Sequence, residues 1–379
     1  MPGRIPALRI GPLALVAPVV LAPMAGVTDA SFRRLCRDFG PGLVYVNEMV
    51  TARGIVERND KSLKMVRFGD DERPRSVQLY GTAPGTMGEA VRYLVGEVGV
   101  DHVDLNFGCP VPKVTRKGGG AALPVRRRLL ADIIAAAVRA AAPAGVPVTI
   151  KCRIGVHDGL QTFLDTGRAA EDNGAAAIAL HARTAEQRYA PYARWSAIAE
   201  LKAAVTSIPV LGNGDIWEAA DALAMMAETG CDGVVIGRGC LGRPWLFAEL
   251  LAAFAGRPVP PPPRLGSVAA AMARHAALLC DEHGAVNGIR CFRKHVGWYL
   301  AGYPVGPALR RDLAQAASLA DVVARLGDVD PDVELPAAGR RVVRGHRDGP
   351  RAVSLPDGWL DLVDDPTPPE GAELLVSGG

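Results

Sequence analysis

Residues 19–26 read VVLAPMAG, a short β-branched run that ends at Pro23. Such a run, bounded by a proline, indicates a buried strand. An open doubly wound sheet would favour a glycine-rich turn directly after its first strand. Residues 22–26 (APMAG) do not provide one, so this stretch favours a closed barrel over an open sheet.

Similar apolar runs recur along the first 256 residues. They lie at residues 43–47, 76–80, 102–106, 148–153, 177–181, 209–212 and 233–237. Stretches with helical character separate most of them, such as residues 129–142, 162–173, 195–205 and 217–228. Strands that alternate with helices predict parallel βαβ units, and eight strands in about 250 residues predict an α/β fold of the (β/α)8 TIM-barrel class.

The sequence changes character after this barrel, which we assign to residues 1–256. Residues 257–264 (RPVPPPPR) hold five prolines, and a stiff linker is expected over residues 257–265. Residues 266–335 are predicted to form a small all-helical domain. Residues 336–379 are rich in Gly, Pro and charge, with arginines first and acidic residues later, which predicts a loosely ordered tail.

The composition excludes several classes of protein. The chain has 379 residues, 49% of them hydrophobic and 22% charged, which is enough for a large core. A net charge of +3 excludes a uniformly basic nucleic-acid coat but not a local basic patch. Seven irregularly spaced cysteines predict neither a disulfide scaffold nor a metal site. The apolar N-terminal stretch is too short and proline-rich to span a membrane, so a cytoplasmic protein without a membrane partner is expected.

The carboxyl ends of the strands carry the catalytic groups in a TIM barrel. Glycine-containing turns follow the seventh and eighth strands, Asn213-Gly214-Asp215 and Gly237-Arg238-Gly239. Their backbone N–H groups could approach a phosphate, and Arg238 would add charge-assisted hydrogen bonds. These turns predict a phosphate-bearing cofactor, although ordinary turns would have the same composition.

Two polar residues within strands point to a flavin. Lys151 has apolar neighbours, so its ammonium group needs a partner. A flavin that gains negative charge at its N1/O2 edge on reduction would provide one, as would Asp104 or Glu48. Gln78 offers a donor and an acceptor for the N3/O4 edge of a flavin or for a pyrimidine, or it is a hydrogen-bonded amide of the core.

Cys109 stands in a Gly-Cys-Pro turn just after the fourth strand. A free thiol has a pKa near 8.5, so at neutral pH it can donate a proton as a general acid. The alternative role is that of a nucleophile with His181 as its base. The other cysteines lie in apolar or helical contexts and are expected to be packing residues.

The loop after Cys109 is strongly basic. Residues 111–128 contain six basic residues and no acidic one, together with a Gly118-Gly119-Gly120 run. This composition suits a mobile lid that meets phosphates, with Lys113, Arg116 and Lys117 as candidate contacts. A solvated charge run is the alternative.

Together these motifs resemble the tRNA-dihydrouridine synthase family, flavoenzymes built from an FMN barrel followed by a small helical domain. The resemblance extends over about residues 8–326, with the motifs in the family's order. The segments that carry it are residues 22–29 (APMAGVTD), 32–33, 104–110 (DLNFGCP), 148–153 (VTIKCR), 181–184 (HART), 213–216 (NGDI), 237–239 (GRG), 242–245 (GRPW), 292–295 (FRKH) and 298–299.

The resemblance implies an FMN-dependent oxidoreductase, with NADPH as its reductant, that reduces the C5=C6 bond of specific uridines in tRNA. Hydride would pass from N5 of FMN to C6, and Cys109 would protonate C5. The implied FMN contacts are Pro23, Met24, Ala25, Gln78, Lys151, His181, Asn213, Gly214, Asp215, Gly237 and Arg238. Contacts with the substrate or tRNA are expected at Asn106, Arg153, Arg183, Lys113, Arg116, Lys117, Arg290, Arg293 and Lys294. We expect a monomer whose partners are tRNA and NAD(P)H.

Two basic segments beyond the barrel are candidates for tRNA contacts. Arg290, Arg293 and Lys294 are spaced so that a helix presents them on one face, which is typical of phosphate contacts and also of a solvated helix face. The five arginines between residues 340 and 351 are hypothesised to add further contacts. Two departures from the family stand out: residues 188–195 lack the Gly and the Asp familiar before Trp195, and Asn47 replaces a small residue.

Other functions are compatible with parts of this pattern. Dihydropyrimidine and dihydroorotate dehydrogenases use the same FMN barrel on free pyrimidines, but a free base needs neither a basic loop nor a basic helix. A non-catalytic RNA-binding barrel would have no use for Cys109 and Lys151. A phosphate-binding isomerase, or an aldolase with a Schiff base at Lys151, would leave residues 106–110 without a role.

Overall fold

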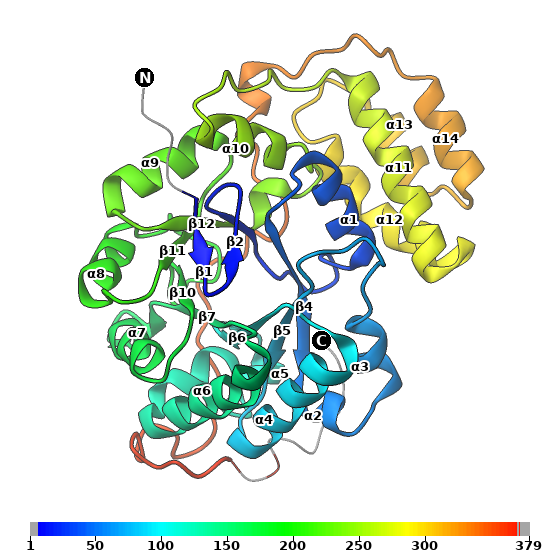
Figure 1. The fold of residues 1–379 in the computed structure, drawn as a ribbon. Helices are drawn as coiled ribbons and strands as arrows, with labels where there is room; N and C mark the ends of the chain where they lie inside the picture. The colour runs from blue at the N-terminus through cyan, green and yellow to red at the C-terminus, as the bar shows by residue number, and fades with distance from the viewer. Residues whose placement is uncertain (1–6, 370, 372–379) are drawn as a thin grey trace.

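The computed structural model describes residues 7–369 and residue 371 (Figure 1). Eight parallel strands close into a barrel in the order β10-β11-β12-β3-β4-β5-β6-β7. They are β3 (Val19–Leu21), β4 (Val44–Thr51), β5 (Ser76–Tyr80), β6 (His102–Phe107), β7 (Val148–Arg153), β10 (Ala177–His181), β11 (Val210–Asn213) and β12 (Gly233–Ile236). The predicted (β/α)8 barrel is confirmed.

Successive side chains of each strand point to opposite faces of the sheet and so enter two different cores. Val19 and Leu21 of β3 pack outward against the helices, whereas Val20 points into the barrel. A hairpin of β1 (Arg9–Ile10) and β2 (Leu13–Ala14) lies across the barrel in Figure 1 and packs Ile10 against these inward side chains. The hairpin closes the amino-terminal end, and the carboxyl end remains for a site.

Helices cover the outside of the barrel (Figure 1). They are α1 (Ala30–Phe39), α2 (Ala52–Val56), α3 (Asp60–Met65), α4 (Pro84–Tyr93), α6 (Arg127–Ala141), α7 (Phe163–Asp172), α8 (Ser196–Ala204), α9 (Ala219–Thr229) and α10 (Leu246–Phe254). In α6, Leu130, Ile133 and Ala137 recur at helical spacing and are all buried. Such a stripe fixes which face of the helix packs on the sheet. A short hairpin of β8 (Gly155–His157) and β9 (Leu160–Gln161) follows β7.

A second helical unit follows the exposed, proline-rich segment at residues 257–264. It consists of α11 (Leu265–His283), α12 (Ala285–Tyr299), α13 (Pro307–Ala314) and α14 (Leu319–Gly327). Its core includes Phe292 and Leu313, together with Leu35 of α1 and Trp245 before α10. The helical unit therefore shares a hydrophobic core with one side of the barrel. Within the described residues, no helix has the length and apolar character needed to cross a membrane.

The described part of the C-terminal tail runs back over the barrel. After a short turn, η5 (Ala337–Gly339), the Arg344 side chain is 2% exposed and that of Trp359 is 3% exposed. We call residues 340–363 the strap. Its course differs from the loosely ordered tail that composition predicts, because a few buried anchor residues hold a segment that is otherwise rich in Gly, Pro and charge.

Candidate active site

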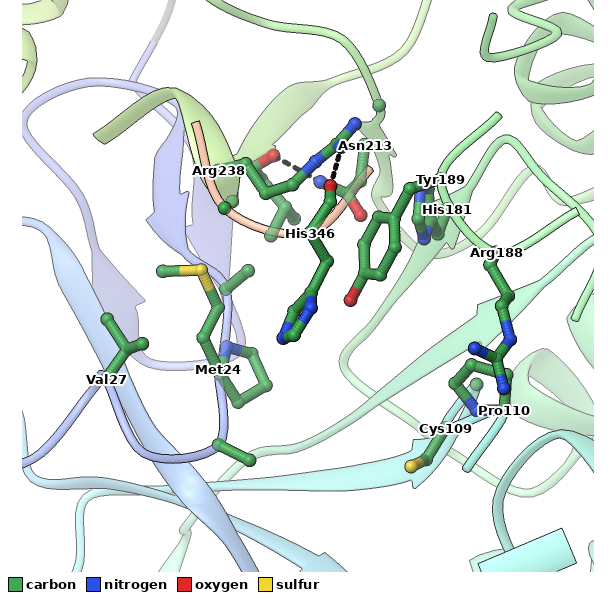
Figure 2. Close-up of a pocket in the computed structure, with 18 of the residues that line it drawn as sticks. Met24, Val27, Cys109, Pro110, His181, Arg188, Tyr189, Asn213, Arg238 and His346 are labelled. Carbon is green, nitrogen blue, oxygen red and sulfur yellow. Dashed lines mark hydrogen bonds between the residues drawn. The ribbon is translucent and has the colours of Figure 1, made fainter. Parts of the chain in front are cut away.

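A cavity of about 710 Å³ opens at the carboxyl end of the barrel, and its lining comes from seven of the strands and from the segment that follows β3 (Figure 2). The eleven residues at which FMN contacts were expected all line it: Pro23, Met24, Ala25, Gln78, Lys151, His181, Asn213, Gly214, Asp215, Gly237 and Arg238. Five of the other expected site residues line it as well: Asn106, Cys109, Arg153, Arg183 and Lys294. Lys113, Arg116, Lys117, Arg290 and Arg293 do not.

The floor of the cavity rests on a chain of buried hydrogen bonds that begins at His102. Its ring lies between Ser76 Oγ (2.7 Å from Nδ1) and Thr149 Oγ1 (2.8 Å from Nε2), and Thr149 donates to Asp104 Oδ1 at 2.6 Å. Because the single hydroxyl proton of Thr149 goes to the carboxylate, His102 Nε2 must carry a proton and Nδ1 must accept one from Ser76. Burial lowers the pKa of His102 to about 4, in agreement with this neutral ring.

The same carboxylate orients the amides above it. Asp104 Oδ2 accepts from Gln78 Nε2 at 2.7 Å, so Gln78 Oε1 faces Asn106 and accepts from its Nδ2 at 2.9 Å. Asn106 Oδ1 then accepts from the backbone N–H groups of Gly108 and Cys109, at 3.0 and 2.9 Å. Gln78 is thus a hydrogen-bonded core amide that still lines the cavity. One N–H and one lone pair of its amide are left for a ligand.

Asn47, which departs from the familiar sequence, also supports this floor. The register of β4 against β5 shifts between Val46 and Met49, which leaves Asn47 out of the regular ladder. Its Oδ1 accepts from the backbone N–H of Gln78 at 2.9 Å, and its Nδ2 donates to Met65 O at 3.0 Å. An amide replaces the missing backbone partner at this bulge.

Cys109 is placed as a protonated thiol. Burial raises the pKa of its thiol above the usual value. Figure 2 shows His181 and Cys109 well apart on one side of the cavity, and within the described residues no hydrogen bond joins the two side chains. Burial and then the charge of Arg153 lower the pKa of His181 well below 6.5. The geometry favours a proton donor over a thiolate paired with a histidine base.

Lys151 faces the cavity without a carboxylate partner. Its Nζ donates to Asn213 Oδ1 at 3.1 Å, and Asn213 Nδ2 donates to Val235 O at 2.7 Å, which fixes that amide. Among the described residues no ion pair joins Lys151 to Asp104 or Glu48. Burial, followed by the charge of Arg153, lowers the pKa of Lys151 to about 8. An anionic ligand here would restore the stabilisation that its ammonium group lacks.

The two glycine-containing turns lie side by side and are joined by Asp215. This residue has a φ of +56°, a conformation that Asp tolerates better than most residues. Its carboxylate accepts from Arg183 Nη2, with both oxygens at 2.7 Å, and lies 3.5 Å from Arg238 Nη2. At Gly237 even an added Cβ would find no atom closer than 3.9 Å, so its backbone is open to a ligand.

Arg153 and Arg183, expected to contact the substrate, line the cavity and also hydrogen-bond within the protein. Arg153 Nε donates to Gly108 O at 2.9 Å, and Nη1 donates to Thr184 O and Arg188 O, both at 3.0 Å. Arg183 is 2% exposed and adds a bond from Nε to Pro191 O at 2.8 Å. Both side chains line the cavity, but their donors hold its loops together. A sequence does not distinguish an arginine that binds phosphate from one that binds a carbonyl or carboxylate.

The basic loop after Cys109 is anchored rather than free. It forms α5 (Pro112–Thr115) and η2 (Gly120–Val125), and residues 118–126 are buried. Arg126 lies with its guanidinium 4.5 Å from the centre of the Trp359 ring and bonds Asp365 at 3.0 Å. Lys113 and Arg116 remain exposed on α5 and just after it. The mobile lid expected from three glycines is therefore a loop held by the strap.

The basic residues of α12 have three different environments. Arg290 is exposed, whereas Arg293 donates Nε and Nη2 to Ala316 O at 3.0 and 2.7 Å. Lys294 donates to Gly26 O and lines the cavity. The predicted common face exists, but only Arg290 is left exposed without a recorded partner among the described residues.

Several cavity residues were not anticipated from the sequence. Tyr189 and Trp217 lie 4.6 and 5.2 Å from the Arg238 guanidinium, and aromatic residues shortly after strand ends could have suggested them. His346 and Asp348 of the strap also line the cavity. Nothing local marks these two residues, because only the course of the strap brings them to the barrel.

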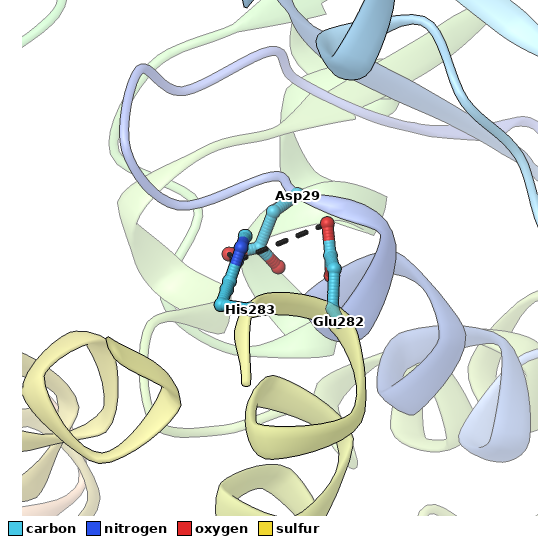
Figure 3. Close-up of side chains that lie close together, drawn as sticks. All are labelled: Asp29, Glu282 and His283. Atoms are coloured by element: carbon cyan, nitrogen blue, oxygen red, sulfur yellow. Dashed lines mark ion pairs between the residues drawn. The ribbon is translucent and has the colours of Figure 1, made fainter. Parts of the chain in front are cut away.

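Asp29, Glu282 and His283 place their ligand atoms within 4.8 Å of one another where the barrel meets α11 (Figure 3). Each has a structural partner. Asp29 accepts from Phe32 N at 2.8 Å as the N-cap of α1, and Glu282 Oε2 accepts from Ser31 N at 2.7 Å. His283 Nε2 lies 3.8 Å from Asp29 Oδ2. The cluster joins the helical unit to α1.

The amino-acid sequence is similar to that of one family and of several of its members. Residues 20–331 match the sequence model of the family described as dihydrouridine synthase (Dus). The chain is 56% identical to a probable tRNA-dihydrouridine synthase of Mycobacterium tuberculosis (strain ATCC 25618 / H37Rv) over 380 residues, which cover 99% of this chain and 97% of that protein. It is 41% identical to tRNA-dihydrouridine synthase B of Xanthomonas axonopodis pv. citri (strain 306) over 297 residues, or 78% of this chain and 88% of that one.

Among solved structures, histamine dehydrogenase from Rhizobium sp. 4-9 superposes with a TM-score of 0.50 at 13% identity, covering 87% of this chain and 65% of that chain. At this identity the likeness concerns the fold alone.

Proposed function

Since the chain belongs to the dihydrouridine synthase family, we propose that it reduces the C5=C6 bond of specific uridines in tRNA. In this proposal FMN is the tightly bound cofactor, NADPH its reductant and Cys109 the proton donor. We further propose that it acts in the cytoplasm as a monomer. Seven unpaired cysteines support a reducing compartment.

The cavity fits FMN in size and in the chemistry of its lining. A volume of about 710 Å³ lies within the usual range of about 300–1,000 Å³ for ligand sites. The open backbone at Gly237 suits a phosphate, the Gln78 amide suits the pyrimidine-like edge of a flavin, and Lys151 offers positive charge beside it. When bound, FMN supplies the hydride that C6 of the uracil ring receives.

The chain's own residues supply the proton and the geometry. Asn106 holds the Cys109 turn through the N–H groups of Gly108 and Cys109, and Arg153 holds it through Gly108 O. A thiol whose pKa is raised by burial keeps its proton at neutral pH and can deliver it to C5. The Cys109 turn, held by Asn106 and Arg153 in the same cavity as Lys151, is the observation that carries the proposal.

Exposed cations on the loop after Cys109 and on the helical unit support an RNA substrate. Lys113 and Arg116 lie on the loop directly after Cys109, and Arg290 lies exposed on α12. Such cations contact phosphates and position a nucleic acid. A uridine in a tRNA loop must leave its stack to reach the cavity, which costs a few kcal/mol.

The proposal is tested anaerobically with the flavin of the holoenzyme fully reduced. Addition of tRNA that lacks dihydrouridine should return the absorbance of oxidised flavin, whereas free uracil and orotate should not. Cys109→Ala should slow this reoxidation by about 10²–10⁴-fold, the range for loss of a general acid. Cys291→Ala is the matched control, because Cys291 is a half-buried cysteine of α12 outside the cavity.

Reoxidation by a free pyrimidine but not by tRNA would replace the proposal with a dehydrogenase of free bases. A purified chain that binds no FMN would remove its premise. If both cysteine variants behaved like the unaltered protein, Cys109 would not be the proton donor.

A further inference from the structure

The strap lies outside the part of the chain that matches the family's sequence model. The match to the family's sequence model ends at residue 331, before the strap begins. Nevertheless Gly345, His346 and Asp348 line the same cavity as the glycine-containing turns after β11 and β12. In Figure 2 the His346 side chain points into the cavity between Met24 and Tyr189.

Three anchors hold the strap in this position. Arg341 donates to Glu218 Oε2 at 3.1 Å and to Asp221 Oδ1 at 2.9 Å, at the start of α9. Arg344 donates to Trp298 O and Ala301 O, at 3.1 and 3.0 Å, at the end of α12.

The third anchor is on the opposite side of the cavity. Trp359 Nε1 donates to Ala122 O at 2.9 Å, and its ring packs against Gly118 in the loop that follows Cys109. The strap thus connects the helical unit, the turns after β11 and β12, and the loop that follows Cys109.

Between these anchors the strap contacts the residues that would hold a cofactor phosphate. Arg238 Nη1 donates to His346 O at 2.6 Å, and the ring of His346 lies nearly parallel to that of Tyr189, with centroids 6.0 Å apart. Asp348 pairs with Arg188 at 3.4 Å, and Arg351 N donates to Glu186 O at 2.8 Å. The strap lies directly over this end of the cavity.

The strap encloses the cavity without filling it. The volume of about 710 Å³ remains with the strap in place, so a cofactor and the strap can be present together. Residues 346–350 are exposed, which makes this segment an outer wall. A wall over a filled cavity slows the exit of the ligand, and affinity within one site is tuned mostly through the rate of dissociation.

We propose that the strap is a retaining wall of the cofactor site: FMN leaves only when residues 345–348 lift away from the turn at Gly237 and Arg238. This inference rests on the proposed FMN site. It also assigns the strap's arginines differently from the RNA contacts suggested by composition. Of those arginines, Arg341 and Arg344 already bind α9 and α12, and their side chains serve to hold the wall.

A matched pair of glycines tests the wall without removing it. Gly345 has a φ of +75°, and an added Cβ would lie 2.7 Å from Leu241 Cδ1 and 3.6 Å from Arg238 Cγ. Gly345→Ala should therefore push the strap off the turn. Gly349 meets nothing within 4 Å of an added Cβ, so Gly349→Ala should leave the strap in place.

The experiment measures release of FMN from the purified holoenzyme after dilution, followed by flavin fluorescence. A chain that ends at Pro336 should release FMN about tenfold faster than the full chain, and Gly345→Ala should release it several-fold faster. Gly349→Ala should match the full chain. Thermal unfolding of each apoprotein shows whether the barrel is still folded.

The outcomes separate this inference from the function on which it rests. Equal release rates for the full chain, Gly345→Ala and the shortened chain would overturn the retaining wall and leave the FMN site intact. Loss of tRNA affinity in the shortened chain with unchanged FMN release would also overturn it, in favour of RNA contacts. Absence of FMN from the full chain would instead contradict the proposed function.

Discussion

One buried carboxylate sets the direction of the amides between the barrel interior and the catalytic turn. Asp104 accepts from both Thr149 and Gln78, and a carboxylate offers no donor. Gln78 must therefore present its oxygen to Asn106, and Asn106 its oxygen to the turn of Cys109. A residue that does not line the cavity thus orients residues that do.

Asp104→Asn tests this orientation. The NH2 group of the new amide would face either Thr149 Oγ1 or Gln78 Nε2. Where it faces Gln78 Nε2, two donors oppose each other, so we expect the Gln78 amide to turn and its bond to Asn106 to be lost. Unfolding by denaturant should show a loss of about 1–3 kcal/mol, typical of an unsatisfied buried group. The tRNA-dependent kcat should fall with little change in KM. Asp132→Asn, at an exposed position of α6, should change neither quantity.

Lys151 predicts a pH dependence of cofactor binding. Its pKa of about 8 in the free protein means that it carries its charge below pH 8 and loses it above. The O2 acceptor at the N1/O2 edge of the flavin favours the ammonium form and raises that pKa, so FMN affinity should be highest below pH 8 and fall as the pH rises through it. Fluorescence titrations across this range should show the fall, and Lys151→Met should abolish it. The same slope in the variant would assign the effect to another group.

At the scale of elements, the junction between α1 and α11 contains an ion pair between His283 and Asp29. The carboxylate of Asp29, 3.8 Å from its Nε2, raises the pKa of His283 above 6.5. Figure 3 shows this pair beside Glu282, which binds the first turn of α1. The junction is therefore tighter when His283 is protonated.

This pair predicts how stability changes with pH. A histidine whose pKa is higher in the folded state contributes its stabilisation fully below pH 6.5 and loses it as the pH rises through the raised value. Between about pH 6 and 8 the melting temperature should fall more in the unaltered protein than in His283→Gln. His157→Gln, an exposed histidine of β8, is the control and should follow the unaltered protein. Parallel curves for all three proteins would contradict the assignment.

At the scale of the whole molecule, the barrel and the helical unit are joined by one hydrophobic core. Leu35 belongs to α1 of the barrel, yet its side chain is 1% exposed and lies in the core of the helical unit. Trp245, just before α10, takes part in the same core. Two units that share a core are expected to unfold together.

Leu35→Ala measures that coupling. Loss of a buried leucine side chain costs about 2–5 kcal/mol, and here the cost should appear in a single transition seen both by far-UV circular dichroism and by tryptophan fluorescence. Val323→Ala, at an exposed position of α14, should change the free energy of unfolding by less than about 0.5 kcal/mol. Separate transitions for the two probes would show that the units unfold independently.

Much of the site could be anticipated from the sequence because the carboxyl ends of parallel strands lie at one face of a barrel. Cys109, Lys151, His181 and Asn213 are far apart in the chain, but each follows or ends a barrel strand, and those ends meet at one face. Local patterns of apolar residues and turns determine the strands, and closure of the barrel then brings these side chains into one cavity. For the same reason the eleven expected cofactor residues line it together.

The partners of each side chain were decided only by the tertiary structure. Arg183 and Arg153 have the charge of phosphate ligands in the sequence, but in the fold Asp215 and the carbonyl of Gly108 take up part of their donors. The strap's composition suggested a loose tail, yet two buried side chains, Arg344 and Trp359, hold it over the barrel. Local sequence determines backbone conformation and polarity. Contacts through space depend on which distant segment the fold brings alongside, and no short-range pattern encodes that.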